Sequence, residues 1–351
     1  MPLLVHLRGS VAVLLLVCGS TALAQSIPAT FTVGVAGDVL LDRGVRARLR
    51  AVGPAALLKE THACIVQCDA VIANLECPAT LLRAPLEKKF VFRAEPRWLF
   101  ALREAGITHL TLANNHSNDQ GRAGLVATVD ALRAAAMTPL GAGATQDAAC
   151  APVLLAGNGV RLAVFASVPL PLENWMFADS LAGPCQATAA QLAARIRAWK
   201  REHPEDAVLV LLHWGREFHE TPEPDQVADA HALVDAGADA IAGHHPHVVQ
   251  RVECYRGKPI LYSIGNFLFD QRAPLASRCV FARFSVGAGG RISTVLHPFA
   301  IRRCAPVPMH RTAREQFRND LERLSPGVRL TSHGDAWIVE TSPHAAAGAR
   351  Q

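Results

Sequence analysis

The chain has 351 residues, of which 50% are hydrophobic and 19% are charged, so it is long and apolar enough to bury a sizeable core. This composition excludes a wholly disordered chain, and 25 glycines with 22 prolines exclude a collagen-like repeat. The formal net charge is +5 and no long basic run occurs, so we expect no nucleic-acid partner.

Residues 1–24 have the pattern of a secretory signal peptide. Arg8 is their only charged residue, an apolar run covers residues 11–17, and Ala22-Leu23-Ala24 forms a small-residue cleavage site. The apolar run is short for a membrane span, so we expect cleavage and export to the periplasm or the medium. The alternative is an uncleaved segment that anchors the protein in the membrane. Residues 25–30 are predicted to be a linker.

Residues 31–310 are predicted to form one α/β domain. Short apolar runs flanked by Gly or Asp are typical of buried strands, and the longer stretches between them have helical spacing. This alternation implies crossover connections and a layered fold. The expected strands are residues 31–36, 70–73, 107–113, 207–212, 238–242 and 260–264. The expected helices are residues 45–58, 96–104, 122–136, 189–202 and 225–235.

Two further segments alternate in the manner of antiparallel hairpins. They are residues 153–166, which contain Asn158-Gly159, and residues 280–298, which contain a glycine-rich turn. We therefore expect mixed sheets. Residues 311–351 are predicted to be a C-terminal extension. Its expected helix, short strand and frayed tail are residues 312–324, 336–339 and 346–351.

Eight cysteines follow the predicted signal peptide. An even number in an exported chain favours disulfides, although the pairing stays open. Cys64 and Cys68 are spaced like a metal-binding pair, but no second closely spaced pair completes a zinc site. We therefore assign the cysteines no chemistry. The eight are Cys64, Cys68, Cys77, Cys150, Cys185, Cys254, Cys279 and Cys304.

Six apolar runs are each followed directly by residues that can bind a metal or an anion. Loops at the carboxyl ends of neighbouring strands surround one crevice in α/β sheets, so we expect these residues to converge. Their mixed nitrogen and oxygen ligands suit Zn, Mn or Fe and require no sulfur. The six groups are Gly37-Asp38, Asn74-Leu75-Glu76, Asn114-Asn115-His116, His213-Trp214-Gly215, residues 243–247 and Gly265-Asn266.

Each group taken alone has an ordinary structural explanation. Asp38 could be a turn residue or a helix cap, and a single histidine such as His213 at a strand end is commonly a hydrogen-bonded structural group. His245-Pro246-His247 carries more weight, because proline stiffens the backbone between two imidazoles. The coincidence of six groups is what indicates one site.

These motifs resemble the CapA family, which is associated with poly-γ-glutamate capsule biosynthesis and belongs to the calcineurin-like metallophosphoesterase superfamily. The similarity runs from about residue 31 to residue 271, and Asn114-Asn115-His116 and Tyr262-Ser263-x-Gly265-Asn266-Phe267 are its most specific parts. The resemblance implies a metallophosphoesterase-like four-layer α/β/β/α sandwich with mixed sheets and a metal centre at the strand ends.

The resemblance also implies a set of ligands for one or two divalent transition-metal ions (Mn, Fe or Zn). The superfamily's usual Asp-x-His opening is here Asp38-Val39-Leu40, and its bridging aspartate is here a glutamate, so one ion is better supported than two. Asp38 and His247 would bind the first metal, Glu76 would bridge, and Asn115, His213 and His245 would bind the second.

Metal-assisted hydrolysis is the implied reaction, with the metal activating a water and polarising a phosphoryl oxygen. His116 would act as the acid for the leaving oxygen or stabilise developing charge. Asp119 would orient His116 or, alternatively, cap a helix. Arg43 would clamp an anionic oxygen or form a salt bridge at a helix start.

Lys88, Lys89 and Arg93 flank two phenylalanines, and each of them is expected to lie on a solvated strand; the alternative is that they attract a polyanion, either a phosphate ester or poly-γ-glutamate.

Three functions follow from this interpretation. The first is an extracytoplasmic metal-dependent hydrolase, of phosphoesterase type, in poly-γ-glutamate or envelope-polymer biosynthesis. The second is a non-catalytic accessory protein that binds or guides poly-γ-glutamate, and the third is a metal-dependent γ-glutamyl amide hydrolase. The expected partners are an anionic substrate, either a phosphoester or poly-γ-glutamate, and the capsule synthesis machinery. His116 favours catalysis, whereas the missing imidazole at Leu40 favours the accessory function.

Overall fold

The computed structural model describes residues 30–342. The predicted signal peptide, all but the last residue of the linker and the C-terminal tail lie outside these residues. Within them, no helix combines the length and the apolar character needed to cross a membrane.

The larger sheet has ten strands and is mixed, as the sequence predicts. Strands β1, β2, β3 and β4, which run from the middle of the sheet to one edge, are parallel to one another. On the other side of β1, strands β14, β15, β18 and β17 each run antiparallel to their neighbours. The main order is β17 (Val328–His333), β18 (Ala336–Thr341), β15 (Ile292–Arg302), β14 (Arg278–Gly287), β1 (Thr30–Val39), β2 (Ala70–Leu75), β3 (His109–Thr111) and β4 (Thr138–Leu140). β13 (Asn266–Leu268) pairs with β1, and β16 (Ala305–Pro308) pairs with β15.

The second sheet has six strands, of which β12, β10, β9 and β7 are parallel to one another. Antiparallel hairpins complete both edges. The order is β11 (Val252–Tyr255), β12 (Lys258–Leu261), β10 (Ala240–His244), β9 (Ala207–His213), β7 (Val160–Ser167) and β6 (Val153–Gly157). A small separate sheet joins β5 (Ala142–Gly143) to β8 (Gly183–Pro184).

Three apolar cores separate the layers. Val35 of β1 and Leu209 of β9 belong to the core between the two sheets. Val208 of β9 belongs to a different core, because successive side chains of a strand point to opposite faces. That core carries α7 (Ala189–Glu202) and α8 (Pro224–Asp235) on the second sheet.

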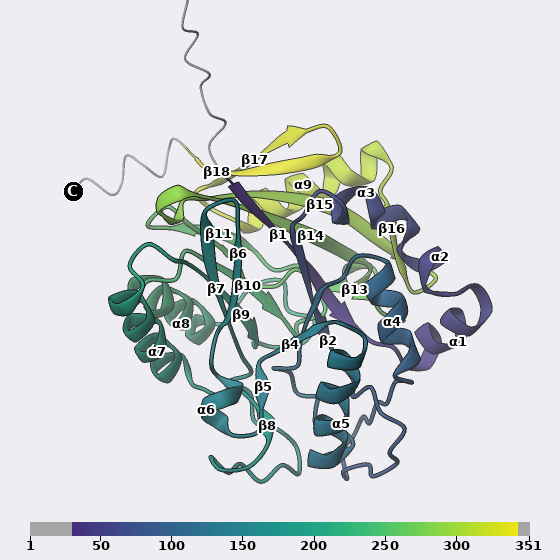
Figure 1. Cartoon of the computed structure of the whole chain (residues 1–351). Helices are drawn as coiled ribbons and strands as arrows, with labels where there is room; N and C mark the ends of the chain where they lie inside the picture. Colours follow the sequence, from purple (N-terminus) through teal and green to yellow (C-terminus); the bar gives the residue numbers. More distant parts are fainter. Residues whose placement is uncertain (1–29, 343–351) are drawn as a thin grey trace, which may run out of the picture.

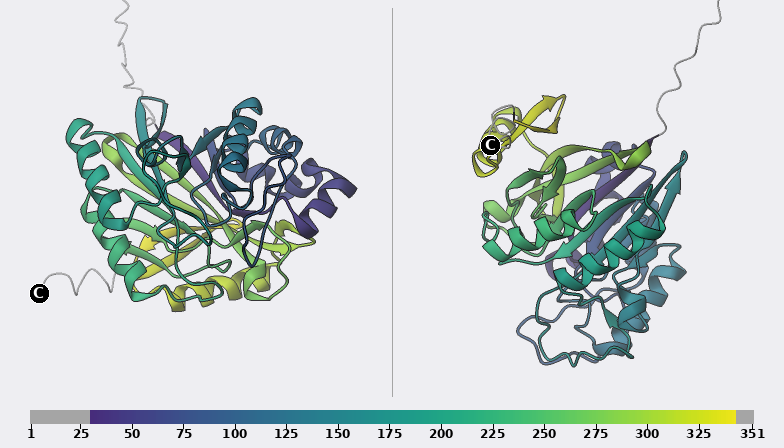
Figure 2. Two further views of the ribbon diagram at one scale, coloured as in Figure 1. Left: turned by 90° about the horizontal axis from the view of Figure 1, so that it is seen from below. Right: turned by 90° about the vertical axis from the view of Figure 1, so that its left-hand side faces the viewer.

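The third core attaches helices to the first sheet, which completes the predicted four-layer α/β/β/α sandwich. Figure 1 shows α7 and α8 on one side of the sheets and α1, α2 and α4 on the other, and the left view of Figure 2 shows the same layers from below. The helices on this side are α1 (Arg43–Val52), α2 (Pro54–Leu58), α4 (Arg97–Glu104) and α5 (Gly121–Ala134). Short elements occur at η1 (Lys59–Thr61), α3 (His62–Ile65), α6 (Gln146–Ala149), η2 (Leu275–Ser277) and η3 (Ala288–Gly290).

Two predictions of local structure are wrong. The helix expected at residues 45–58 is broken at Gly53, whose φ is +76°, and Pro54 begins a new helix. The second error is the omission of several strands, including β4, β11, β13, β16 and β17. Residues 328–333 form β17, whose three polar residues at the end hid the alternation, and Gly334 with φ +60° turns the chain into β18. The predicted C-terminal helix is α9 (Arg311–Leu324).

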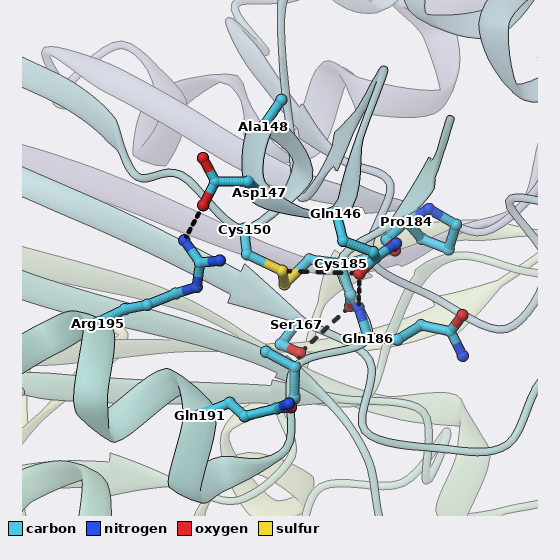
Figure 3. The surroundings of a disulfide bond; sticks show 12 residues. Gln146, Asp147, Ala148, Cys150, Ser167, Pro184, Cys185, Gln186, Gln191 and Arg195 are labelled. Carbon is cyan, nitrogen blue, oxygen red and sulfur yellow. Dashed lines mark hydrogen bonds and ion pairs between the residues drawn. A yellow bond between two sulfur atoms is a disulfide. The ribbon is translucent and has the colours of Figure 1, made fainter. Parts of the chain in front are cut away.

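Within the described residues, one of the expected disulfides is present. Cys150 and Cys185 are bonded and join the end of α6 to the end of β8 (Figure 3). The other six predicted disulfide cysteines are thiols, which is a correction. Cys77 and Cys279 lie in the core beneath the helices, and the thiol of Cys68 donates to the Cys64 carbonyl (3.5 Å).

Candidate metal centre

The structure brings all six predicted ligands to the carboxyl ends of neighbouring parallel strands. Asp38 is the penultimate residue of β1, Glu76 follows β2 and Asn115 follows β3. In the second sheet His213 ends β9, and His245 and His247 follow β10. The register pairs Asp38 with Asn74 and His213 with His244, so the strand ends are level. Residues from two sheets therefore meet at one place.

Asp38, Glu76 and His247 form the tightest group, with one potential ligand atom from each within 4.8 Å of the others. His247 Nδ1 lies 3.3 Å from Asp38 Oδ2, and His247 Nε2 lies 3.6 Å from Glu76 Oε1. All three side chains are buried, yet Glu76 Oε2 has no hydrogen-bond partner. Buried carboxylate oxygens are normally satisfied, so this one fits a position beside a cation.

A second group adjoins the first through Glu76. His213 Nε2 lies 2.8 Å from Asn115 Oδ1 and 3.2 Å from His245 Nδ1. Its distance to Glu76 Oε1 is 4.0 Å. Glu76 thus lies between the two groups, where a carboxylate could contact two ions.

The hydrogen bonds of His213 fix its tautomer. The Asn74 amide donates to Asp38 Oδ1 (2.8 Å) and lies 3.2 Å from His213 Nδ1, while Asn74 Oδ1 accepts from Asn114. With both amide hydrogens used as donors, the proton of neutral His213 lies on Nε2 and points to Asn115. A metal at His213 Nε2 would require the other tautomer, with the proton on Nδ1 and the Asn74 amide turned away. The group of Asp38, Glu76 and His247 therefore suits a metal better than the group of Asn115, His213 and His245.

The backbone of the histidine loop is held in an unusual conformation. His245 and His247 have φ values of +97° and +57°, which non-glycine residues rarely adopt. The amide of His245 donates to Asp38 Oδ2 (3.3 Å), and Asn266 bonds both the ring (3.0 Å) and the carbonyl (3.2 Å) of His247. These contacts position both imidazoles. Gly243 is required at the start of the loop, because a Cβ there would lie 1.9 Å from the Tyr262 carbonyl oxygen.

His116 is positioned by Asp119. His116 Nδ1 lies 2.9 Å from Asp119 Oδ2, which also accepts from the Phe92 amide (2.7 Å). The Nδ1–H therefore donates to the carboxylate and leaves Nε2 free to act on a bound molecule. Asp119 does not cap a helix, since α5 begins at Gly121 with Gln120 as its N-cap.

The ammonium group of Lys88 does not face solvent, so both interpretations of this residue, a solvated strand and an attraction for a polyanion, are wrong. Its ammonium group is buried and donates to Asp119 Oδ1 (2.5 Å), to the Asn115 carbonyl (2.6 Å) and to Asn118 Oδ1 (3.0 Å). Each of its three protons thus has an acceptor. Lys89 is exposed, with its ammonium 5.3 Å from the centre of the Phe90 ring.

Arg43 lies at the rim of the site. Its guanidinium forms an ion pair with Asp270 and lies over the Phe92 and Phe269 rings, 5.0 and 5.6 Å from their centres. Arg93 donates to the Thr80 carbonyl (3.0 Å).

Burial and neighbouring charges shift the pKa values of the titratable residues in the site. Burial would raise the pKa of Asp38, but the hydrogen bond and charge of His247 hold it below its ordinary value. Burial raises the pKa of Glu76 well above its ordinary value. Burial lowers the pKa of His213, and it lowers that of His245 to about 4. Burial also opposes charge on His247, but Glu76 and Asp38 raise its pKa to about 9. The charged form of His247 is therefore favoured beside the carboxylate of Asp38.

Several site residues were not singled out from the sequence. Asn74, Asn114 and Asn266 occur within the motifs, but their side-chain contacts depend on which strands are neighbours. Phe269 packs on His247, with ring centres 4.7 Å apart, and no local pattern indicates this contact. The position of Lys88 has no sequence signal either, because lysines are mostly exposed.

Comparison with known proteins identifies the family of the chain. The family described as "Bacterial capsule synthesis protein PGA_cap" matches residues 32–271. The Capsule biosynthesis protein CapA of Bacillus anthracis is 30% identical over 284 residues, which cover 79% of this chain and 69% of the relative. A Mycobacterium tuberculosis protein named "Probable polyglutamine synthesis accessory protein" is 33% identical over 301 residues, covering 79% and 78% of the two chains.

A similar fold occurs in a crystal structure described as "Putative 5'-Nucleotidase from Staphylococcus aureus". The TM-score is 0.50 at 15% sequence identity, and the similarity covers 84% of this chain and 58% of the other. The predicted metallophosphoesterase-like fold class is thereby supported. The family match over residues 32–271, together with the relatives at 30% and 33% identity, shows that the chain belongs to the bacterial capsule synthesis proteins of the PGA_cap family.

Proposed function

We propose that the protein is an extracytoplasmic metal-dependent hydrolase, of phosphoesterase type, in the biosynthesis of a poly-γ-glutamate capsule or another envelope polymer. Asp38, Glu76 and His247 would hold one Mn, Fe or Zn ion, and Asn115, His213 and His245 would contribute to a second position. The observation that carries the proposal is the placement of Glu76. Its Oε1 lies 3.6 Å from His247 Nε2 and 4.0 Å from His213 Nε2, and its buried Oε2 has no hydrogen-bond partner.

The residues of the chain suit hydrolysis. A divalent ion at this position would polarise a phosphoryl oxygen and make a water more acidic. His116 would protonate the leaving oxygen through Nε2, because its Nδ1–H is held by Asp119. Lys88 would hold Asp119 in place through their ion pair, and the ring of Phe92, 4.4 Å from that of His116, would restrict the imidazole. Arg43 would contact an anionic oxygen at the rim.

The place of the reaction is inferred from the sequence and from relatives. The relatives include proteins named for capsule and PGA biosynthesis, and residues 1–24 have the pattern of an export signal. Both support a role on an extracytoplasmic polymer.

A non-catalytic accessory function is the second candidate. Leu40, where the superfamily has an imidazole, is fully buried in the core beneath the helices and supplies no ligand. One relative is also named as an accessory protein. In this case the same residues would bind poly-γ-glutamate without cleaving it.

The two candidates are separated by comparing Asn115→Ala with its neighbour His116→Ala. Bound metal is measured by elemental analysis, and hydrolysis is measured on an activated phosphodiester, on phosphomonoesters and on poly-γ-glutamate. We expect Asn115→Ala to lower metal occupancy. We expect His116→Ala to keep the metal and to lower turnover about a hundred- to ten-thousand-fold, since it removes the general acid. His333→Ala, a change of an exposed histidine on β17, is the control.

Unaltered turnover of metal-loaded His116→Ala would reject the acid role. Absence of hydrolysis by the metal-loaded wild type on every substrate would favour the accessory function. Cleavage of poly-γ-glutamate alone would identify a γ-glutamyl amide hydrolase.

A further inference from the structure

We infer that an arginine-lined groove beside the metal centre binds an extended anionic chain through its oxyanions. The groove is lined by Arg272, Arg302, Arg303, Phe269 and Asp270, among other residues. The inference rests on the proposed function, because it takes the metal centre as the place where one end of that chain is processed.

The groove adjoins the metal centre through Phe269. It has a volume of about 630 Å³. The Phe269 ring lines it and also packs on His247, with ring centres 4.7 Å apart. Arg43, whose guanidinium lies over the same ring, marks the border between the two. The groove and the metal centre are therefore separated by the side chain of a single residue.

The charge of the groove is positive and uncompensated. Asp270 is the single acidic residue of its lining, and it is occupied by Arg43 and by the Gly44 amide (3.1 Å). Arg272, Arg302 and Arg303 are exposed, and within residues 30–342 none of them has a carboxylate in ion-pair distance. Arginine presents a planar fork of donors that matches the oxygens of a carboxylate or a phosphate.

The hairpin that carries Arg302 and Arg303 has a strained turn. β15 and β16 form a hairpin in which Arg302 pairs with Ala305, so Arg303 and Cys304 are its two turn residues. Their φ values are +50° and +69°, a conformation for which Asn-Gly is the preferred sequence. A tight turn built from unfavourable residues is commonly retained for function. Here it holds a guanidinium at the edge of the groove.

Several separate guanidinium groups favour a ligand with several separate charges. A small phosphoester would bind at the metal centre alone and would leave the three arginines without a partner. A polymer with an oxyanion on each repeat would reach both places. Its charged groups would be carboxylates, as in poly-γ-glutamate, or phosphates, as in a polyphosphate; both offer the same paired oxygens.

Binding of the two polymers to the full-length, Mn-loaded protein tests the inference. Fluorescently labelled poly-γ-glutamate and inorganic polyphosphate are titrated separately and followed by anisotropy. The variant Arg302→Ala/Arg303→Ala is compared with Arg197→Ala/Arg201→Ala, which removes two exposed arginines of α7 on the opposite helix layer and matches the change in net charge.

We expect the groove variant to bind one or both polymers about tenfold more weakly, and the α7 variant to differ from wild type by less than about twofold. The polymer that loses more affinity identifies carboxylate or phosphate as the source of the oxyanions. Circular dichroism checks folding. If the hairpin variant is misfolded, Arg272→Ala replaces it, because Arg272 lies outside the hairpin.

Equal weakening in both variants, unchanged binding in the groove variant, or no binding of either polymer by wild type would overturn the inference. The readout does not require turnover. If the wild type binds a polymer through the groove but hydrolyses no substrate, only the proposed hydrolase function is rejected. If it hydrolyses small phosphoesters but binds neither polymer, only the groove inference is rejected.

Discussion

At the scale of single residues, the buried lysine behind the metal centre links two parts of the site. Lys88 contacts Asp119, which orients His116, and it also binds the carbonyl of Asn115. One ammonium group thus supports both the proposed general acid and a proposed metal ligand. Removing one partner of a buried ion pair leaves the other charge without compensation.

Lys88→Met should therefore destabilise the protein. The Asp119 carboxylate would stay buried without its cation, so we expect the free energy of unfolding to fall by about 3 kcal/mol in denaturant titrations. Lys89→Met is the control: it changes the adjacent exposed lysine and should alter stability by less than about 0.5 kcal/mol. An equal effect of both changes would contradict this account of Lys88.

At the scale of elements, the turn of the β15–β16 hairpin has a backbone conformation that its two residues do not favour. Arg303 and Cys304 take positive φ values that favour Asn and Gly. A non-glycine residue in this region loses about 1 kcal/mol relative to glycine.

Arg303→Asn/Cys304→Gly should stabilise the hairpin and with it the fold. We expect a gain of about 1 to 2 kcal/mol in the free energy of unfolding, measured in urea. Arg302→Ala precedes the turn and should give no such gain. A loss of stability in the double variant would show that the contacts of Arg303 and Cys304 outweigh their backbone strain.

The elements also show what the sequence can and cannot predict. Runs such as residues 207–212 indicate their strands because both faces are buried, and Gly53-Pro54 could have indicated the break in the expected helix. The convergence of Asp38 and His213 follows from the rule for strand ends. The place of Lys88 does not, because it depends on how a long loop folds back over Asp119.

Strand β3 carries a histidine that makes stability depend on pH. Burial lowers the pKa of His109 to about 4, and the nearby Arg103 acts in the same direction. The ordinary value is 6.5. The neutral form is favoured in the folded state, so its contribution is complete above pH 6.5 and is lost as the pH falls toward 4.

His109→Gln should therefore flatten the pH dependence of stability in this window. We expect wild type to lose up to about 3 kcal/mol more than the variant between pH 6.5 and 4, in denaturant titrations at each pH. His333→Gln changes an exposed histidine and should leave the dependence as in wild type. Parallel curves for wild type and His109→Gln would contradict the role of burial.

At the scale of the whole molecule, the disulfide encloses a long segment that reaches the site loop. Cys150 and Cys185 are 35 residues apart. Between them, Glu173 accepts from the Lys89 amide (3.1 Å), and Trp175 packs under Arg122, 4.2 Å from its guanidinium carbon. Around the bond, Gln146 accepts from the Gln186 amide (3.1 Å; Figure 3). The crosslink therefore limits how far this segment can separate from the rest of the chain.

Cys150→Ala/Cys185→Ala should lower the free energy of unfolding by about 4 kcal/mol, because the unfolded chain regains the freedom of a 35-residue loop. Thermal unfolding with and without dithiothreitol measures the effect. Dithiothreitol should leave the variant unchanged, since the six other described cysteines are thiols. A further loss of stability on reduction would reveal a second disulfide.

The direction of β1 determines how the protein can be attached to a surface. Thr30 begins the strand and Asp38 lies near its other end, so the two are about 26 Å apart at about 3.3 Å per residue. A sensor chip or bead coupled on the Thr30 side would leave the metal centre facing the solution. A fluorophore in the loop after β10 would instead cover it. Amino-terminal coupling is therefore the geometry of choice for measuring polymer capture.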